Sequence, residues 1–245
     1  MTYCVAIQID EGLVLMSDSR THAGVDNIAS FRKMSVWQPG DRALVLLTAG
    51  NLGVSQAVVH ALDQGVELAS GRKESLLTVS GMLEAARLVG AAMREVYRLD
   101  ADALRAQGQD YTVSFILGGQ IQGGEPNLFQ IYSAGNFIAA SDETPYFQMG
   151  ETKYGKPIID RIIRPSTPLE VVAKCALVSM DSTLRSNLSV GFPLDLAIYR
   201  RDSHRLQLRH ITEDDEYFDD IRRRWMEGLR SVFDALPDPD WLNGN

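Results

Sequence analysis

The sequence predicts an α+β fold in which two β-sheets pack face to face and helices cover the outer side of each sheet. Strand-like stretches come in runs separated by pairs of helix-like stretches, an order that does not suit a doubly wound parallel sheet. With 245 residues and 45% hydrophobic side chains, the chain can build one substantial core without a disulfide or a metal. Because no linker, low-complexity segment or internal repeat interrupts it, residues 1–245 are expected to form a single domain with a core over residues 2–212.

The first predicted elements are a hairpin and a buried strand. Residues 2–9 alternate and are rich in β-forming side chains, and residues 13–16 follow a short Asp-Glu-Gly turn. Residues 43–47 form a continuous apolar run, which is typical of a buried strand. Asn51 then lies where an N-cap is expected, before a helix over residues 52–61.

A second helix and a second block of strands follow. The helix is predicted because its apolar residues recur at steps of three and four along one stripe, namely Leu83, Ala86, Val89, Met93 and Val96. Residues 111–118 and 127–133 are predicted strands, separated by a turn rich in glycine and proline.

Two further helices are predicted before the last strands. The first spans about residues 156–163. The second begins at Thr167-Pro168-Leu169-Glu170, which has the form of a capping box with proline in the first turn. Its inward-facing residues are expected to be Val171, Val172, Cys175, Val178 and Met180.

The last part of the chain predicts a hairpin and an amphipathic helix. Residues 194–200 and 205–211 are predicted strands, joined at Asp202-Ser203. A helix is expected over residues 213–236, and residues 237–245 are expected to be a tail. The helix carries an apolar stripe at steps of three and four, formed by Phe218, Ile221, Trp225, Leu229 and Val232.

Composition and charge argue against several classes of protein. The formal net charge of −8 argues against a nucleic-acid or anionic-membrane surface. No stretch approaches the roughly 20 apolar residues of a membrane span, and no basic region precedes an apolar one at the N-terminus. The two cysteines are too few for a disulfide framework, and the four histidines have no metal-ligand spacing. We therefore expect a cytoplasmic protein with buried free thiols and no metal or cofactor.

Thr2 is the first residue with a chemical interpretation. Methionine aminopeptidases accept a small second residue, so Thr2 is expected to become the mature N-terminus. A threonine hydroxyl needs an adjacent base to act as a nucleophile, and the free α-amine of the same residue can serve, since its pKa is about 7.7–8.0. One residue would then supply both nucleophile and base.

Asp18 and Lys33 extend this interpretation. Asp18 ends the second predicted strand, and Lys33 lies between apolar neighbours at the start of another. Taken singly, Asp18 is more often a turn-capping residue and Lys33 a surface cation. Beside an N-terminal threonine, Lys33 would lower the pKa of the hydroxyl and of the α-amine, with Asp18 keeping the lysine charged.

The sequence resembles a known family through several motifs. These are Asp18-Ser19-Arg20-x-x-x-Gly24, Lys33, Thr48-Ala49-Gly50, the Met-Thr-Tyr-Cys-Val start, and the stretch from Met180 to Gly191. Together they resemble the proteasome β-subunits and HslV peptidases, and most closely the bacterial proteasome homologues called Anbu (ancestral β-subunit). Over nearly the whole chain, the resemblance implies the four-layer αββα sandwich of the N-terminal-nucleophile hydrolases.

The resemblance also implies roles for particular residues. Thr2 matches the family nucleophile, Asp18 its acidic partner and Lys33 its lysine. Gly50 matches the glycine whose backbone N–H forms the oxyanion hole. The pocket for the substrate residue preceding the cut would be lined by Thr21, Phe31 and Thr48.

Three departures from the family pattern stand out. The Asp-x-x-Ser-Gly motif is replaced, and Asp181 and Ser186 are the candidates for its acid and hydroxyl. The family's Gly-Ser-Gly is replaced by Gly150-Glu151-Thr152. No propeptide precedes Thr2, so its exposure is expected to depend on removal of Met1.

The sequence therefore predicts a threonine endopeptidase that hydrolyses peptides or unfolded proteins inside a self-compartmentalising homo-oligomer. The C-terminal helix is expected to serve contacts between subunits. A non-catalytic assembly subunit and an N-terminal-nucleophile amidase for a small-molecule amide remain alternatives. The chain has no Gly-x-x-x-x-Gly-Lys-Ser/Thr loop, so any ATPase partner would be a separate protein.

Overall fold

The structure, a computed structural model, describes residues 2–22, 28–68, 71–108 and 110–242. The chain divides into two compact units, Met1–Glu213 and Asp214–Asn245. The first unit holds both large sheets and four of the helices, and each unit is described by itself.

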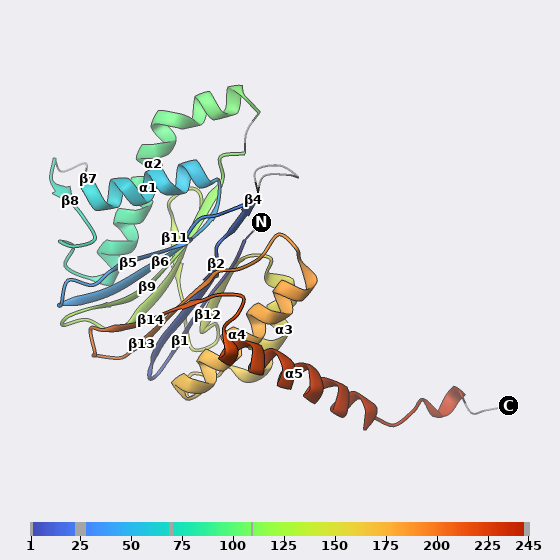
Figure 1. Cartoon of the computed structure of the whole chain (residues 1–245). Helices are drawn as coiled ribbons and strands as arrows, with labels where there is room; N and C mark the ends of the chain where they lie inside the picture. The colour runs from blue at the N-terminus through green and yellow to red at the C-terminus, as the bar shows by residue number, and fades with distance from the viewer. Residues whose placement is uncertain (1, 23–27, 69–70, 109, 243–245) are drawn as a thin grey trace. The chain divides into compact units, whose positions relative to one another are not determined.

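The first sheet contains the N-terminal hairpin. Its five antiparallel strands are, in spatial order, β12 (Tyr146–Gly150), β1 (Tyr3–Ile9), β2 (Gly12–Asp18), β13 (Leu194–Arg200) and β14 (Leu206–Ile211). Helices α3 (Thr152–Ile162) and α4 (Leu169–Ser186) pack on each other, and α4 packs on β1 and β2 (Figure 1). The sheet therefore has one helix-covered face and one face toward the other sheet.

The second sheet lies across the core from the first. Its strands are, in order, β11 (Phe137–Ala139), β10 (Asn127–Ile131), β9 (Val113–Ile121), β6 (Arg42–Gly50) and β5 (Met34–Trp37). Helices α1 (Leu52–Gln64) and α2 (Met82–Ala106) cover its outer face. Two short antiparallel pairs complete the unit: β3 (Arg20–His22) with β4 (Ile28–Ser30), and β7 (Val66–Glu67) with β8 (Lys73–Glu74).

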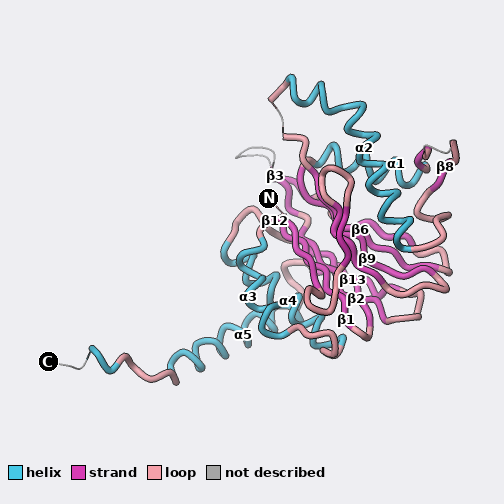
Figure 2. Tube along the Cα trace, turned by 180° about the vertical axis from the view of Figure 1, so that it is seen from behind, coloured by secondary structure: helices cyan, strands magenta, loops and turns pink. Residues whose placement is uncertain are grey.

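Buried apolar residues fill the spaces between the layers. Between the sheets, buried residues of both inner faces form one cluster, among them Leu13, Leu15, Val45, Leu47 and Ile116. A second cluster joins the outer face of the second sheet to α1 and α2. The layers follow the order helix, sheet, sheet, helix, as Figure 2 shows from behind. This confirms the predicted αββα sandwich.

Several local predictions need correction. Strands β11 and β12 and the two short pairs were not predicted, since they span only two to five residues each. The capping box is also wrong: Pro168 is the N-cap of α4 and makes no side-chain cap bond. Instead, Thr167 Oγ1 accepts a hydrogen bond from the Arg164 amide at 2.8 Å. Asn51 does cap α1, because its side chain accepts from the Val54 amide at 3.1 Å.

The second unit is mainly the helix α5 (Glu216–Asp234), followed by a 3₁₀ turn at Asp240–Leu242. Asp215 caps the helix by accepting from the Phe218 amide at 2.9 Å. Large apolar side chains stay more than half exposed along this unit, namely Leu229, Val232, Phe233, Leu236 and Trp241. We call these five residues the C-terminal apolar stripe.

Both cysteines are free and buried, as predicted. Burial raises the pKa of the Cys175 thiol to about 12. Burial is also the main reason that the pKa of Cys4 lies far above its usual range, and the nearby Asp18 carboxylate raises it further. Within the described ranges, no helix is both long and apolar enough to cross a bilayer.

Candidate active site

The site is built around the beginning of β1. Thr2 is buried and immediately precedes the strand. Its carbonyl accepts a hydrogen bond from the Glu151 amide at 2.8 Å. Gly150 makes this close approach possible: its φ is 80°, and a Cβ there would lie 1.8 Å from the Thr2 carbonyl oxygen. The position of Thr2 is therefore set by backbone contacts with the end of β12.

Asp18 and Lys33 form a buried ion pair. Lys33 Nζ lies 2.7 Å from Asp18 Oδ1 and 2.7 Å from the Arg20 carbonyl oxygen. The two side chains are 7% and 0% exposed, respectively. The Tyr3 amide also donates to Asp18 Oδ1 at 3.0 Å, so the residue after Thr2 is bonded directly to the carboxylate that holds the lysine.

Burial determines the direction of the Asp18 pKa. Desolvation raises the pKa of the carboxyl above 3.8, because it penalises the charged form. The Lys33 ammonium and the amides of Tyr3 and Gly191 oppose this effect without reversing it. The second carboxylate oxygen, Oδ2, accepts from the Gly191 amide at 3.3 Å.

Lys33 is carried by a short segment between β4 and β5 that is bonded to Ser19, just after β2, and to β6. The Phe31 amide donates to the Ser19 carbonyl at 2.9 Å, and the Thr48 amide donates to the Lys33 carbonyl at 2.9 Å. Cys4 Sγ, on β1, contacts the Thr48 carbonyl oxygen at 3.7 Å. Thr48 on β6 is thereby linked to β1, which begins just after Thr2, and to the segment that carries Lys33.

Gly50 ends β6, two residues beyond Thr48. Its φ is 108°, and a Cβ would lie 2.1 Å from the Thr112 carbonyl oxygen, so only glycine fits here. The residue is exposed, and its chain passes directly into the N-cap of α1.

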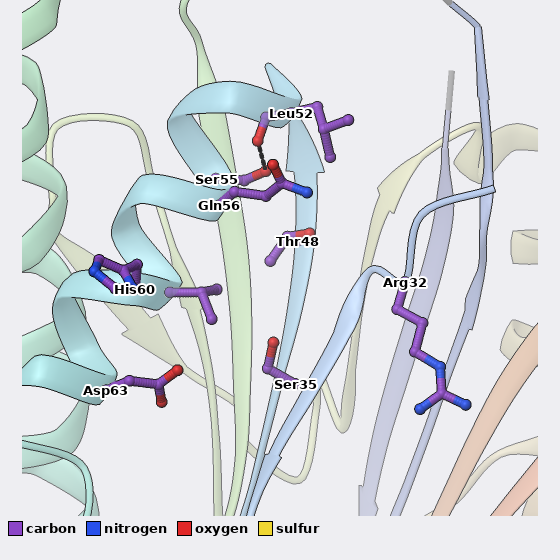
Figure 3. Close-up of a pocket in the computed structure, with 9 residues that line it drawn as sticks. Arg32, Ser35, Thr48, Leu52, Ser55, Gln56, His60 and Asp63 are labelled. Atoms are coloured by element: carbon purple, nitrogen blue, oxygen red, sulfur yellow. Dashed lines mark hydrogen bonds between the residues drawn. The ribbon is translucent and has the colours of Figure 1, made fainter. Parts of the chain in front are cut away.

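A pocket of about 190 Å³ lies between α1 and strands β5 and β6. Figure 3 shows Thr48 and Ser35 on the strands facing Gln56 and His60 on the helix. The remaining lining residues are Arg32, Leu52, Ser55, Val59 and Asp63. Of the three predicted pocket residues, only Thr48 lines it. Thr21 lies on β3, and Phe31, 40% exposed, precedes β5.

The predicted supporting residues lie on α4. Asp181 is buried and pairs with Arg185 Nε at 3.4 Å, while Ser186 is the exposed last residue of the helix. In the same stretch of sequence, Gly191 is the residue whose amide binds Asp18. That contact spans 173 positions and is made by a backbone group, so no side-chain motif in the sequence could reveal it.

The sequence reasoning also missed a buried network behind Thr2. Tyr3 contacts Ser179 through the two hydroxyls, and Gln148 Nε2 donates to the Tyr3 hydroxyl at 2.6 Å. Burial raises the Tyr3 pKa, so the hydroxyl stays protonated. Ser179 lies one helical turn after Cys175, on the face of the helix that was predicted to point inward. This spacing is the sequence signal that could have identified Ser179 as a buried residue. The network fixes the strand that presents Thr2.

The described residues contain no group of three or more His, Cys, Asp and Glu side chains that could hold a metal ion. The site therefore contains the Thr2 hydroxyl, the buried Lys33–Asp18 ion pair and the exposed backbone of Gly50 at the end of β6. That set is suited to acyl transfer through a side-chain nucleophile.

Comparisons with known proteins show the family of the chain. The family described as "Proteasome subunit" matches residues 2–198. The structure is similar to Anbu (ancestral beta-subunit) from Yersinia bercovieri, with 50% identity, 97% of this chain and 98% of that chain covered, and a TM-score of 0.89. It is also similar to the helical assembly of the Anbu complex from Pseudomonas aeruginosa, with 51% identity, 97% and 98% coverage, and a TM-score of 0.90.

A third similar structure is the Anbu (Gly-1) mutant from Hyphomicrobium sp. strain MC1. The two sequences are 47% identical, the match covers 98% of this chain and 99% of that chain, and the TM-score is 0.88. Among the curated proteins, none matches.

Proposed function

Since the chain belongs to the proteasome subunit family, we propose that it is a threonine-type peptidase with Thr2 as its nucleophile. The observation that carries this proposal is the buried Asp18–Lys33 pair, bonded through the Tyr3 amide to the strand that begins after Thr2. A buried ion pair costs desolvation free energy, so a pair bonded to the residue that follows a candidate nucleophile favours a chemical role over a purely structural one.

In the proposed first step, the α-amine of Thr2 takes the proton from Oγ, and Oγ attacks the carbonyl carbon of the peptide bond. The positive charge of Lys33 favours the forming alkoxide, and Asp18 holds the lysine in place. The Gly50 N–H donates to the oxyanion of the tetrahedral intermediate, a contribution worth about 10²–10³ in rate in other hydrolases.

The intermediate then collapses, and the α-amine passes its proton to the departing amine. This leaves the acyl group esterified to Thr2 Oγ. A water molecule, deprotonated by the α-amine, attacks the ester, and Thr2 Oγ regains its proton as the acid product leaves. The substrate residue before the cut would enter the pocket at Thr48.

We further propose that the peptidase works as a homo-oligomer. A similar protein from Pseudomonas aeruginosa forms a helical assembly, and the C-terminal apolar stripe of this chain leaves large side chains exposed. Exposed apolar residues of this size, gathered along α5 and the segment after it, are typical of a protein interface.

The test compares three forms of the protein on a fluorogenic peptide: mature protein without Met1, protein retaining Met1, and Thr2→Ala. Only the mature form is expected to be active, because an amide nitrogen at Thr2 cannot accept the proton. Thr144→Ala, which alters an exposed threonine, is the matched control. A threonine-directed epoxyketone should add once, at Thr2, as read by mass spectrometry.

The other outcomes separate the alternatives. Equal activity in all three forms would mean that Thr2 is not the nucleophile. A mature oligomer with neither hydrolysis nor adduct would indicate an assembly subunit. Cleavage of small amides alone, by a monomer, would indicate an amidase.

A further inference from the structure

The edge strand β5 has a free side. It is the last strand of the second sheet and pairs only with β6 among the described strands. Its register joins Met34 to Leu47 and Val36 to Val45. The Thr48 amide donates a hydrogen bond to the Lys33 carbonyl, so Lys33 and Thr48 form the pair just before Met34 and Leu47.

The register fixes which backbone groups face outward. In an antiparallel ladder, residues alternate between those that bond to the neighbouring strand and those that do not. Because Lys33 bonds inward, Ser35 and Trp37 also bond inward, while Met34 and Val36 direct their N–H and C=O groups to the free edge. Four main-chain groups are therefore available to a further strand.

A pocket lies on each face of this edge. Ser35 points toward α1 and lines the pocket of Figure 3. Met34 and Val36 point to the opposite face, where they line a second pocket of about 210 Å³. Arg32, just before the strand, borders both pockets.

The two pockets differ in chemistry. The pocket at Ser35 is rich in hydroxyl and amide groups. The second pocket is lined by the apolar side chains of Met34, Val36 and Leu208 together with the polar residues Arg32, Asp195 and His210.

Within the second pocket, Asp195 is buried at 7% exposure and is oriented by His210, whose Nδ1 lies 2.8 Å from Oδ1. Its other oxygen, Oδ2, has no hydrogen-bond partner in the described structure, and Arg32 Nε lies 3.8 Å from it. A buried carboxylate oxygen without a partner is an acceptor for a donor that comes from outside.

We propose that the free edge of β5 binds an extended segment of an unfolded polypeptide substrate by β-strand addition. Residues of the added strand opposite Met34 and Val36 share their face and enter the apolar pocket. The residue between them lies on the Ser35 face and leaves the pocket at Thr48 to the substrate residue before the cut. The site thus selects two apolar residues separated by one position and covers Leu208, which is 57% exposed.

Two features indicate a substrate as the occupant. The edge offers only two outward-facing residues, which suits a transient strand better than a permanent interface of about 1,600 Å². It also begins at the residue after Lys33, and its polar pocket includes Thr48, so a bound segment continues toward the candidate nucleophile. The identification of the bound segment as substrate rests on the proposed peptidase function. The inference that β5 accepts an added strand does not rest on it.

The test uses Thr2→Ala protein, so that binding is measured without turnover. The probe is dye-labelled, reduced and carboxymethylated lactalbumin, followed by fluorescence anisotropy. Val36→Pro removes one outward N–H and no sheet bond, and proline is tolerated on such an edge. Val36→Thr keeps that N–H and is the matched control. We expect Val36→Pro to weaken binding roughly three- to tenfold, and Val36→Thr to leave it unchanged.

A second variant does not alter the β5 backbone. Leu208→Glu places a charge in the apolar pocket from β14 and is expected to weaken binding by about the same factor. With Thr2 restored, Val36→Pro should leave kcat/KM for a three-residue reporter peptide within about twofold of the parent, because so short a peptide cannot span both sites. Thermal melts verify that each variant is folded.

Unchanged polypeptide binding in both folded variants would overturn the proposal. A fall in oligomer mass with unchanged binding would also overturn it, by making β5 an interface between copies. Failure of the peptidase proposal has a different signature. Thr2-containing protein would not cleave the reporter, while binding to Thr2→Ala protein would still respond to Val36→Pro.

Discussion

At the scale of single residues, Asp18 connects most of the candidate site. Its carboxylate receives bonds from Lys33, Tyr3 and Gly191, which come from three separate parts of the chain. Its pKa is nevertheless raised, which means that burial destabilises the ionised carboxylate by more than these three partners stabilise it. Asp18 is therefore maintained at some cost to stability, as is common for residues that serve chemistry.

Asp18→Asn is the first variant to make. An asparagine keeps the acceptor for Tyr3 and loses the charge that holds Lys33, so hydrolysis should fall by about 10²-fold or more. The free energy of unfolding at pH 7 should change by about 1 kcal/mol or less, because the costly buried charge is lost as well. Peptide hydrolysis and urea unfolding measure the two effects. A large loss of stability with unchanged activity would contradict the assignment.

The same pair of proteins gives a pH test. Because the pKa of Asp18 is raised in the folded chain, its contribution to stability is fully present below its unfolded pKa of about 3.9. That contribution is lost as pH rises through the folded value. The free energy of unfolding of the parent minus that of Asp18→Asn should therefore decrease as the pH rises above about 3.9. A difference that increases with pH would mean that the pKa is lowered.

Sequence reasoning located Thr2, Asp18 and Lys33 because they lie within one short stretch and carry side chains with recognisable chemistry. The structure joins Asp18 to Lys33 and to the residue after Thr2. The contacts of Gly191 and Ser179 could not be found in this way. They span more than 170 positions and depend on how α4 packs against the first sheet.

At the scale of elements, α3 and α4 pack closely around the Tyr3 hydroxyl. Gly155 on α3 is the point of nearest approach: a Cβ there would lie 2.2 Å from both Ser179 Oγ and the Tyr3 hydroxyl. The glycine is thus explained by packing and not by backbone conformation. Hydrophobic periodicity predicted the helix but could not indicate this approach, which depends on the partner surface.

Gly155→Ala is expected to lower the free energy of unfolding by about 1–3 kcal/mol through overpacking, against a gain of up to about 1 kcal/mol from helix propensity. Ser179→Ala should recover part of the loss by making room, and a double-mutant cycle measures the coupling. Gly53→Ala on α1 is the control, since its nearest contact would be Asn51 Oδ1 at 3.5 Å. Equal effects at the two glycines would contradict the packing argument.

Other elements show why the fold class was predictable while its details were not. The layer order could be predicted because β6 and β9 are long apolar runs and α2 carries a clear apolar stripe. Strands β11 and β12 are too short for periodicity to detect, and their positions depend on pairing with β10 and β1. The capping box at Thr167 failed because its hydroxyl bonds back to the Arg164 amide.

At the scale of the whole molecule, the C-terminal apolar stripe is a set of large apolar side chains that stay exposed in a single chain. Phe233→Asp should lower the mass of the assembly in light scattering, because it places a charge where an apolar contact is expected. Phe233 is 74% exposed in one chain, so monomer stability should barely change. Ser231→Asp adds the same charge outside the stripe and should leave the mass unchanged. Equal masses for all three proteins would remove the stripe from the interface.

The buried thiols have a practical consequence for following such an assembly in solution. Because Cys4 and Cys175 are buried and their pKa values are raised, neither is an available thiolate at neutral pH. A cysteine introduced on the surface is therefore expected to be the one that reacts with a maleimide dye, without deletion of either native residue. The chain can then report distances between copies by energy transfer while its interior keeps its natural packing.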